Sequence, residues 1–269
     1  MTSPTPANSL PPELPDLAAL AQAGPRPLFA TLSGSHLYGF PSPDSDFDLR
    51  GAFVAPLRRV LGLGTLDETY VREDPAFALG GRTIELDWVA HEVGKYCRLL
   101  QRADGVILEQ VYSPLVVIES AWLDELRELA RGCVAKVVVN HYRGFFRTKR
   151  QELTKKPSVK SLLYAYRVAL TGVHALSSGE IEANLEVLAG LYPALAPPGL
   201  VELIARKRAG EEGGLLDEHE LAAQEPALAA LEAGLEAAHE ASSLPFKPTS
   251  GPGLSDFVVR ARLALGGAP

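Results

Sequence analysis

Residues 28–51 read LFATLSGSHLYGFPSPDSDFDLRG. The apolar run over residues 28–32 is typical of a short buried strand, and the small residues at 33–35 predict a turn after it. Prolines and small polar residues at 41–45 exclude regular structure there. From Asp46 onward, polar and apolar residues alternate as in a half-buried strand. The stretch therefore predicts two strands joined by a turn and a loop.

Two aspartates share one face of the second strand. Asp46 and Asp48 are two residues apart, and side chains on a strand repeat with a period of two. Neighbouring carboxylates repel each other, and the pair is costly unless a cation neutralises it or one group is protonated. Mg²⁺ commonly takes one or two carboxylates together with substrate phosphates. The pair therefore predicts a divalent metal site.

A third carboxylate lies on a later alternating segment, residues 83–89, where Glu85 and Asp87 share one face. If this strand lies beside the first two aspartates, three carboxylates can hold two metal ions. One ion would lower the pKa of an attacking hydroxyl and the other would steady the leaving pyrophosphate. We therefore expect Asp46, Asp48 and Asp87 to be both the catalytic and the metal-binding residues.

The turn before the aspartates predicts a phosphate site. Gly34 lets phosphate oxygens approach the backbone, and the Ser35 hydroxyl and nearby N–H groups can donate to them. A helix that begins near Ser35 would favour a triphosphate at its positive end. An Asp-x-Asp pair alone also occurs in calcium loops, in glycosyltransferases and on solvated strands. The joint pattern of strand, Gly-Ser, Asp-x-Asp and later Asp is far more specific.

Gly34-Ser35 followed by Asp46-x-Asp48 resembles the signature of the DNA polymerase β-like nucleotidyltransferase superfamily. A longer form of the pattern is similar to one branch, the RNA-repair-pathway, RNA-ligase-associated polymerase β-like family of predicted nucleotidyltransferases. The longer form adds Tyr38, Gly39, Ser45, Arg50 and Gly51. This resemblance implies an NTP substrate and Mg²⁺ or Mn²⁺ as cofactor, with two ions in the site.

Further segments extend the resemblance over residues 28 to 250. There are four such segments. The first is residues 87–96, and the second is residues 106–109 together with Ser113-Pro114. The third combines Lys160, Tyr164 and Arg167 with Gly179-Glu180, and the fourth is residues 243–245. The chain departs from the family at Tyr164, where the family carries a histidine; a tyrosine still donates a hydrogen bond. The resemblance implies that the nucleotide is bound by Gly34, Ser35, Ser45, Arg50, Lys160, Tyr164 and Arg167.

A basic segment follows the acidic one. Residues 134–170 carry nine Lys and Arg but one acid, Glu152, within a chain of net charge −7. Helical spacing puts several of these cations on one stripe, which suits a triphosphate or an RNA backbone. The expected nucleic-acid or phosphate patch comprises Arg143, Arg147, Arg150, Lys155 and Lys156. The interleaved Tyr142, Phe145 and Phe146 could stack on bases, but such a stripe more often faces the core, which is the interpretation we prefer.

The pattern becomes helical after residue 93. Helices are expected over residues 93–101, 107–112, 121–131, 134–151, 158–178, 200–208, 217–241 and 256–265, with a break at Pro226. The predicted fold class is α+β: a small mixed sheet of the polymerase β-like palm type, followed by a helical C-terminal domain. We expect a flexible N-terminal arm at 1–27 with a helical turn over residues 16–23, a catalytic nucleotidyltransferase domain at 28–115 and a helical substrate-binding domain at 116–269.

The bulk composition fits a cytoplasmic protein. The 269 residues are 46% hydrophobic and 22% charged, which is ordinary for a globular chain. The acidic total argues against non-specific coating of nucleic acid. Cys97 and Cys133 show no metal spacing and are expected to be reduced, buried thiols. No secretory signal and no apolar run of membrane-spanning length is present, so no membrane partner is expected.

Three functions remain open from the sequence. The first is transfer of a nucleotide from an NTP to an RNA end in RNA repair or processing, with NTP and RNA as partners. The second is transfer of AMP to a protein or a small molecule. The third is a non-catalytic binding module of the toxin–antitoxin kind, although such a module has no need of three clustered acids.

Overall fold

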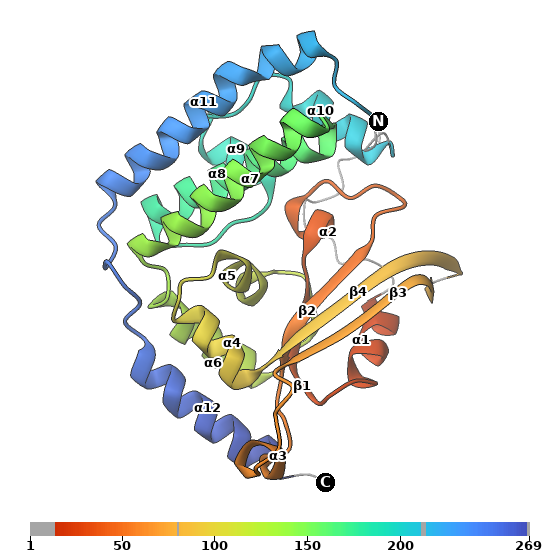
Figure 1. The fold of residues 1–269 in the computed structure, drawn as a ribbon, viewed down its shortest axis with the longest axis vertical. Helices are drawn as coiled ribbons and strands as arrows, with labels where there is room; N and C mark the ends of the chain where they lie inside the picture. The colour runs from red at the N-terminus through yellow and green to blue at the C-terminus, as the bar shows by residue number, and fades with distance from the viewer. Residues whose placement is uncertain (1–13, 80, 211–213, 268–269) are drawn as a thin grey trace. The chain divides into compact units, whose positions relative to one another are not determined.

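The structure is a computed structural model that describes residues 14–79, 81–210 and 214–267. The chain forms two compact units (Figure 1). The sheet unit comprises Met1–Leu37, Asp46–Cys133 and Pro248–Pro269, and the helical unit comprises Tyr38–Ser45 and Val134–Lys247. The predicted order, a mixed sheet with helices followed by a helical part, is confirmed.

The sheet has five strands in the order β3-β4-β2-β1-β5. They are β1 (Pro27–Leu32), β2 (Phe47–Phe53), β3 (Thr69–Leu79), β4 (Arg82–Glu92) and β5 (Val116–Ile118). The pair β2/β4 is parallel and the other pairs are antiparallel, so the sheet is mixed. The three predicted strands correspond to β1, β2 and β4. The sequence pattern did not indicate β5, which has three residues, or β3, an edge strand whose Pro75 interrupts the alternation.

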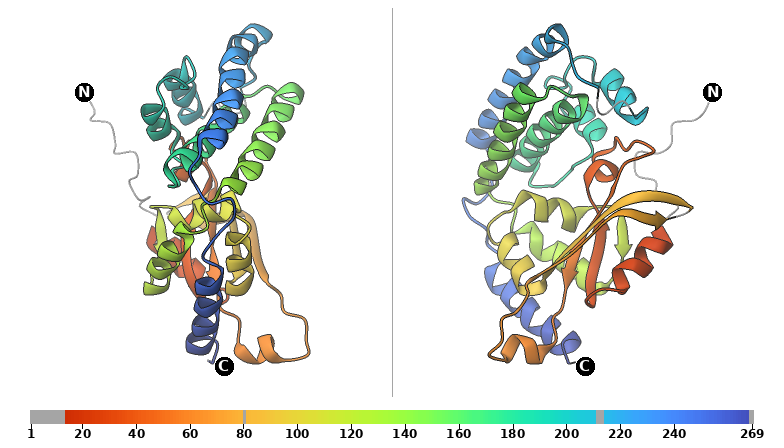
Figure 2. Two further views of the ribbon diagram at one scale, coloured as in Figure 1. Left: turned by 90° about the vertical axis from the view of Figure 1, so that its left-hand side faces the viewer. Right: turned by 45° about the vertical axis from the view of Figure 1, so that its right-hand side comes forward.

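Helices cover the sheet from both sides (Figure 2). The helices of the sheet unit are α1 (Leu14–Gln22), α2 (Gly34–Tyr38), α3 (Leu57–Leu61), α4 (Val93–Leu100), α5 (Gly105–Tyr112), α6 (Ala121–Arg131) and α12 (Gly251–Leu265). On one side, Leu17 and Ala21 of α1 are buried in a core with Leu49, Leu86 and Trp88. On the other side, Tyr96 of α4 packs edge-on against Phe29 of β1, with ring centres 5.4 Å apart.

The N-terminal segment differs from the expected flexible arm. Residues 1–13 lie outside the described part of the chain, whereas α1 contacts β1 and β5. The physical reason is the apolar spacing of Leu17, Leu20 and Ala21, which gives this short helix a face to bury. The sheet unit also extends past residue 115 to Cys133 and takes in α12, because α6 and α12 pack against each other.

The helical unit is built around one buried helix, α8. Its elements are the 3₁₀ turn η1 (Lys136–Val138) and the helices α7 (Val139–Lys155), α8 (Val159–Ser178), α9 (Leu185–Leu191), α10 (Leu200–Arg208) and α11 (Glu218–Ala241). α8 contacts α7, α9, α10 and α11, and most of its side chains are buried. Within the described residues, no helix combines the length and apolar character needed to cross a membrane.

Pro226 does not break the helix in which it lies. α11 runs continuously through it, so the expected break was wrong. A proline has a helix-compatible φ but removes one backbone hydrogen bond, at a cost of about 3 kcal/mol. Leu228, Leu231 and Leu235 of the same helix are buried, and α11 packs on α8. We attribute the continuity to this packing, which offsets the lost hydrogen bond.

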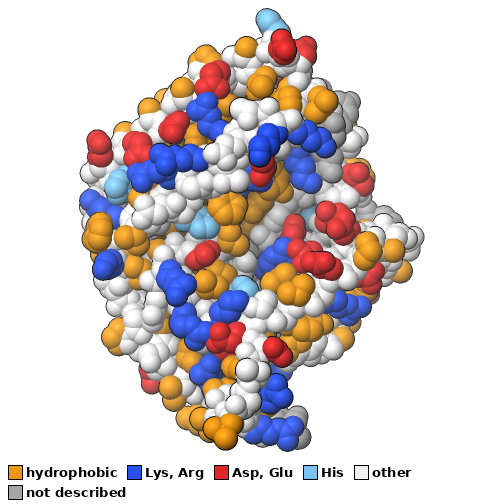
Figure 3. Space-filling view, viewed as in Figure 1, with side chains coloured by type: hydrophobic (Ala, Val, Ile, Leu, Met, Phe, Trp, Pro, Cys, Tyr) orange, Lys and Arg blue, Asp and Glu red, His pale blue; other side chains and the backbone are white. Residues whose placement is uncertain are grey.

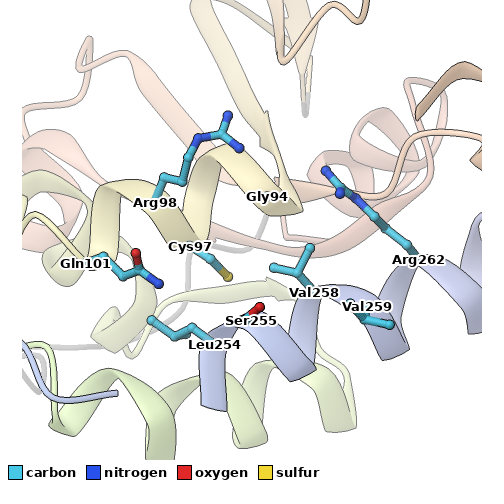
Figure 4. Close-up of a pocket in the computed structure, with 9 residues that line it drawn as sticks. All are labelled: Gly94, Cys97, Arg98, Gln101, Leu254, Ser255, Val258, Val259 and Arg262. Carbon is cyan, nitrogen blue, oxygen red and sulfur yellow. The ribbon is translucent and has the colours of Figure 1, made fainter. Parts of the chain in front are cut away.

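α12 is attached to α4 through a buried ion pair. The Glu92 carboxylate has no exposed surface; it accepts two bonds from the Arg262 guanidinium, at 3.0 and 2.7 Å, and one from the Gly94 amide at 2.7 Å. A pocket of about 250 Å³ lies beside it between the two helices, with Cys97 and Val258 in its lining (Figure 4). Both cysteines are free and buried, as expected, and burial raises the pKa of Cys97 to about 12.

Removing one partner of this ion pair should destabilise the sheet unit. We expect Arg262→Met to lower the free energy of unfolding by about 3 kcal/mol, because it leaves the Glu92 carboxylate buried and unpaired. The double variant Glu92→Gln/Arg262→Met should lose clearly less, since an uncharged amide can still accept the Gly94 hydrogen bond. Urea denaturation measures both. Equal losses in the single and double variants would contradict this account of the contact.

Candidate active site

Asp48 and Asp87 lie side by side on the central strands of the sheet. They are register partners on the parallel strands β2 and β4. Their neighbours Phe47, Leu49 and Leu86 are buried in the core, so alternation turns both aspartates to the opposite face. Their side chains retain 30% and 34% exposure. The predicted convergence of these two carboxylates from separate strands is therefore present.

Arg50 bridges this pair. Its Nη2 lies 2.8 Å from Asp48 Oδ1 and 2.6 Å from Asp87 Oδ2, and its Nη1 donates to the Asp87 carbonyl at 2.6 Å. Arg50 is two residues beyond Asp48, so both side chains point to the same face of β2. A residue expected to bind nucleotide thus occupies the space between the carboxylates. The positive charge that offsets part of their repulsion therefore comes from a side chain of the protein itself.

Asp46 precedes the first residue of β2. Within the described part of the chain, no three His, Cys, Asp or Glu side chains gather into a group that could hold a metal ion. The site nevertheless has the chemistry for a hard cation, because Asp87 Oδ1 is buried and makes no hydrogen bond. A carboxylate oxygen in that state is costly unless a cation or a donor reaches it.

Gly34 is required at its position by Asp48. It has a φ of +62°, a conformation that favours glycine, and a Cβ built on it would lie 1.9 Å from Asp48 Oδ2. The adjacent Ser33 amide donates to the Asp48 carbonyl at 2.9 Å. α2 begins at Gly34, so the condition that a helix begins near Ser35 is met, and Ser35 lies in its first turn. The Gly-Ser turn and the aspartate strand therefore form one packed unit.

One carboxylate of this face was not expected from the sequence. Glu73 on β3 is the register partner of Asp87, so the two side chains point to the same side of the sheet. Glu85 is exposed two residues before Asp87. Acidic side chains gather on the surface over β3 and β4 in Figure 3. Glu73 could have been found only by first identifying β3, which its proline obscured.

Ser45 belongs to a loop held within the helical unit. The Ser45 hydroxyl accepts from the Ser42 amide at 2.9 Å, and the Lys207 ammonium donates to the Ser42 hydroxyl at 2.8 Å. Lys207 has no exposed surface. The loop's Asp44 has a lowered pKa, chiefly through its hydrogen bond with Ser42. No sequence signal distinguished Lys207 from the other basic residues at the end of α10.

The three residues predicted on α8 lie in different environments. Arg167 is 3% exposed, and its guanidinium lies 4.0 Å from the centre of the Tyr38 ring. Tyr164 packs edge-on against Tyr38, with ring centres 5.4 Å apart. Lys160 is exposed near the start of the helix. Arg167 thus packs against the loop that carries Ser45, whereas Lys160 presents its charge at the surface.

The basic stripe on α7 is partly neutralised in space. Arg143 Nε lies 2.6 Å from Glu236, and Arg150 pairs with Glu225 and Glu232, all three acids belonging to α11. The sequence count found no balancing acids because these lie some eighty residues further along the chain. Arg147, Lys155 and Lys156 are exposed. Basic side chains follow α7 in Figure 3.

The aromatic residues of α7 divide between core and surface. Tyr142 and Phe146 are buried, which confirms the core interpretation for both. Phe145 is 41% exposed and stacks on His141, with ring centres 5.0 Å apart. Of the three aromatics, Phe145 alone reaches the surface.

A mixed sheet with a Gly-Ser turn after β1 and aspartates on β2 and β4 has the form of a polymerase β-like nucleotidyltransferase. Residues 14–259 match the sequence profile of the family RlaP, described as the RNA repair pathway DNA polymerase beta family. The chain therefore belongs to this family. The resemblance drawn from the motifs is confirmed, and the match extends it in both directions along the chain.

Two relatives are similar over shorter stretches. The protein MJ0002 of Methanocaldococcus jannaschii is 32% identical over 161 residues, which is 59% of this chain and 63% of that protein. The protein YcgL of Bacillus subtilis is 28% identical over 197 residues, or 70% of this chain and 72% of that protein. Both are described as uncharacterized. The match to the archaeal relative spans less than two thirds of that protein's length.

Removing the guanidinium from between the aspartates should strengthen binding of a divalent cation. We expect Arg50→Met to bind Mn²⁺ about tenfold more tightly, because a charge-assisted contact that competes for the same oxygens is lost. Arg58→Met removes an exposed arginine of α3 and should leave the affinity unchanged. Electron paramagnetic resonance of free Mn²⁺ measures the affinity. Unchanged or weaker binding by Arg50→Met would show that Arg50 does not compete with the cation.

Proposed function

We propose that the chain is a Mg²⁺- or Mn²⁺-dependent nucleotidyltransferase that moves an NMP from an NTP to an acceptor hydroxyl, and that the acceptor is an RNA end. The observation that carries the proposal is the pairing of Asp48 and Asp87 across β2 and β4, with one buried carboxylate oxygen of Asp87 lacking a hydrogen bond. Membership of an RNA repair family supports the reaction class and the acceptor.

The aspartates, the Gly-Ser turn and Arg50 each have a separate role in the proposed reaction. Asp46 and Asp48 would hold two divalent ions, and Asp87 would hold the ion on the side of the attacking hydroxyl. Such ions would neutralise charge and lower the pKa of that hydroxyl. Gly34 and Ser35 bind the β- and γ-phosphates through backbone N–H groups and the serine hydroxyl. With cations bound to the carboxylates, the Arg50 guanidinium would be available to pair with a phosphate.

We assign nucleotide binding in the helical unit to Ser45, Lys160, Tyr164 and Arg167. Arg167 would act by fixing the Tyr38 ring, since its guanidinium packs on that ring and is almost fully buried. Lys160 would contribute the positive charge of an exposed ammonium group. The sheet unit is then the catalytic part and the helical unit the substrate-binding part of the chain.

The exposed lysines at the end of α7 favour a polyanionic acceptor. Lys155 and Lys156 are exposed and adjacent in the chain, whereas Arg143 and Arg150 are paired with glutamates. An ion pair within the protein releases no counterions from nucleic acid, so the unpaired lysines should account for most of the electrostatic attraction. The phosphate-binding patch therefore contains fewer residues than the sequence predicted, because Arg143 and Arg150 are excluded from it.

The contrast between the exposed lysines and the paired arginines predicts how RNA binding depends on salt. The double variant Lys155→Gln/Lys156→Gln should reduce the slope of log K against log salt by about 1.4, from about 0.7 for each lost phosphate contact with a single strand. The charge-neutral pair Arg143→Gln/Glu236→Gln should leave the slope unchanged. Filter binding of a single-stranded oligoribonucleotide measures both. A larger effect from the Arg143/Glu236 variant would place the patch elsewhere.

Transfer itself tests the proposed function. With Mg²⁺, α-labelled NTPs and RNAs with defined 3′ ends, we expect label to appear in the RNA. Asp46→Asn should lower the rate by more than about a hundredfold, since changing even groups that only orient metal ligands costs up to that factor. Asp67→Asn, at an exposed loop position of the same unit, is the matched control.

Two results would redirect the proposal. Label in protein or in a small molecule, with none in RNA, would indicate AMP transfer to a different acceptor. Equal activity of Asp46→Asn and wild type would remove the proposed chemistry.

A further inference from the structure

The face of the sheet that carries the aspartates continues along β4 to His91. Strand register arranges this face in rows across β2, β4 and β3. The rows consist of Asp48, Asp87 and Glu73, then Arg50, Val89 and Val71, then Ala52, His91 and Thr69. Val71 is 53% exposed, so the face is open to solvent between the acidic row and the His91 row.

His91, Thr69 and Lys95 are joined by hydrogen bonds. The Lys95 ammonium donates to Thr69 Oγ1, and Thr69 Oγ1 lies 3.2 Å from His91 Nδ1. An ammonium can only donate, so the threonine hydroxyl accepts from Lys95. The same hydroxyl oxygen is within hydrogen-bond distance of His91 Nδ1, so Thr69 links the ammonium to the imidazole.

His91 is neutral over the physiological range. Burial, followed by the charge of Lys95, lowers its pKa to about 4. The cluster consequently presents the Lys95 ammonium group beside a neutral imidazole, whose N–H is a second hydrogen-bond donor. A partly exposed site that offers donors and one positive charge suits a phosphate oxygen.

The position of this cluster indicates whether it would bind a phosphate of the NTP or a backbone phosphate of the acceptor. His91 lies four residues beyond Asp87 on one strand, or about 13 Å away. A short stretch of extended polynucleotide backbone can span that separation. The row that contains Val71 and Val89 lies between Asp87 and His91. The Gly34 turn is packed against Asp48, at the β2 side of the acidic pair. The cluster lies on β4, the strand of Asp87, which is the side we assign to the attacking hydroxyl.

We propose that Lys95 and His91, linked through Thr69, form a binding subsite for a backbone phosphate of the acceptor strand, upstream of the hydroxyl that reacts. The subsite rests on the proposed nucleotidyl transfer for its orientation. Its ligand class is a single-stranded polynucleotide, and a mononucleotide acceptor or an NTP would not reach it. The valines at positions 71 and 89 would lie under the intervening sugar or base.

A binding measurement tests the subsite without turnover. Fluorescence anisotropy of a labelled single-stranded decaribonucleotide should show that Lys95→Met weakens binding about tenfold and lowers the salt slope by about 0.7, the value for one phosphate contact. Lys95→Arg should restore the slope. Thr69→Val should weaken binding less, because it keeps the Lys95 charge and removes only the hydroxyl that accepts the Lys95 hydrogen bond. Affinity for a fluorescent ATP analogue should stay at the wild-type value in all three.

Lys247→Met, which removes an exposed lysine of the helical unit, is the control for loss of one positive charge and should bind as wild type does. Circular dichroism and Tm show whether each variant is folded. An unchanged salt slope in Lys95→Met, or parallel losses for oligonucleotide and ATP analogue, would overturn the subsite. Failure of the wild type to bind the oligonucleotide would also overturn it.

The subsite and the proposed function can fail separately. Asp48→Asn should abolish transfer yet keep oligonucleotide binding and its dependence on Lys95. If no transfer is found but that dependence holds, the subsite stands and the reaction is wrong. If transfer to RNA is found and Lys95→Met keeps the wild-type KM for the RNA acceptor, the reaction stands and the subsite is wrong.

Discussion

The repulsion between Asp48 and Asp87 is the constraint around which the sheet unit is organised. Parallel pairing of β2 and β4 places two carboxylates next to each other, and the Arg50 guanidinium bridges them within 2.8 Å. Gly34 leaves room for the Asp48 carboxylate where any side chain would collide with it. A protein that needed only a stable sheet would gain from replacing this arrangement with apolar residues. Its presence favours a cation-dependent reaction.

In the helical unit, charged side chains mainly form contacts between elements of the fold. Acids of α11 pair with the inner arginines of α7, and the buried ammonium of Lys207 is bound by serine hydroxyls of the loop that carries Ser45. These contacts hold elements together. Lys155 and Lys156, near the α7–α8 junction, are exposed. In the proposed function these exposed lysines, and not the paired arginines, attract the polyanionic acceptor.

Local periodicity was enough to predict β1, β2, β4 and most helices, and with them the faces of Asp48 and Asp87. It could not predict contacts between distant segments, such as the glutamates that pair with Arg143 and Arg150, or the serines that bind Lys207. β3 was missed because Pro75 breaks the alternation of an edge strand, and Glu73 was missed with it. The His91 cluster needed that register too, since Thr69 lies on β3.

Anomalous diffraction from crystals grown with Mn²⁺ and a non-hydrolysable NTP tests the central claim most directly. The account predicts Mn²⁺ in contact with carboxylate oxygens of Asp48 and Asp87, triphosphate oxygens at the Gly34 turn, and an Arg50 side chain that no longer bridges the two aspartates. Mn²⁺ bound elsewhere, with Arg50 still between the carboxylates, would contradict it.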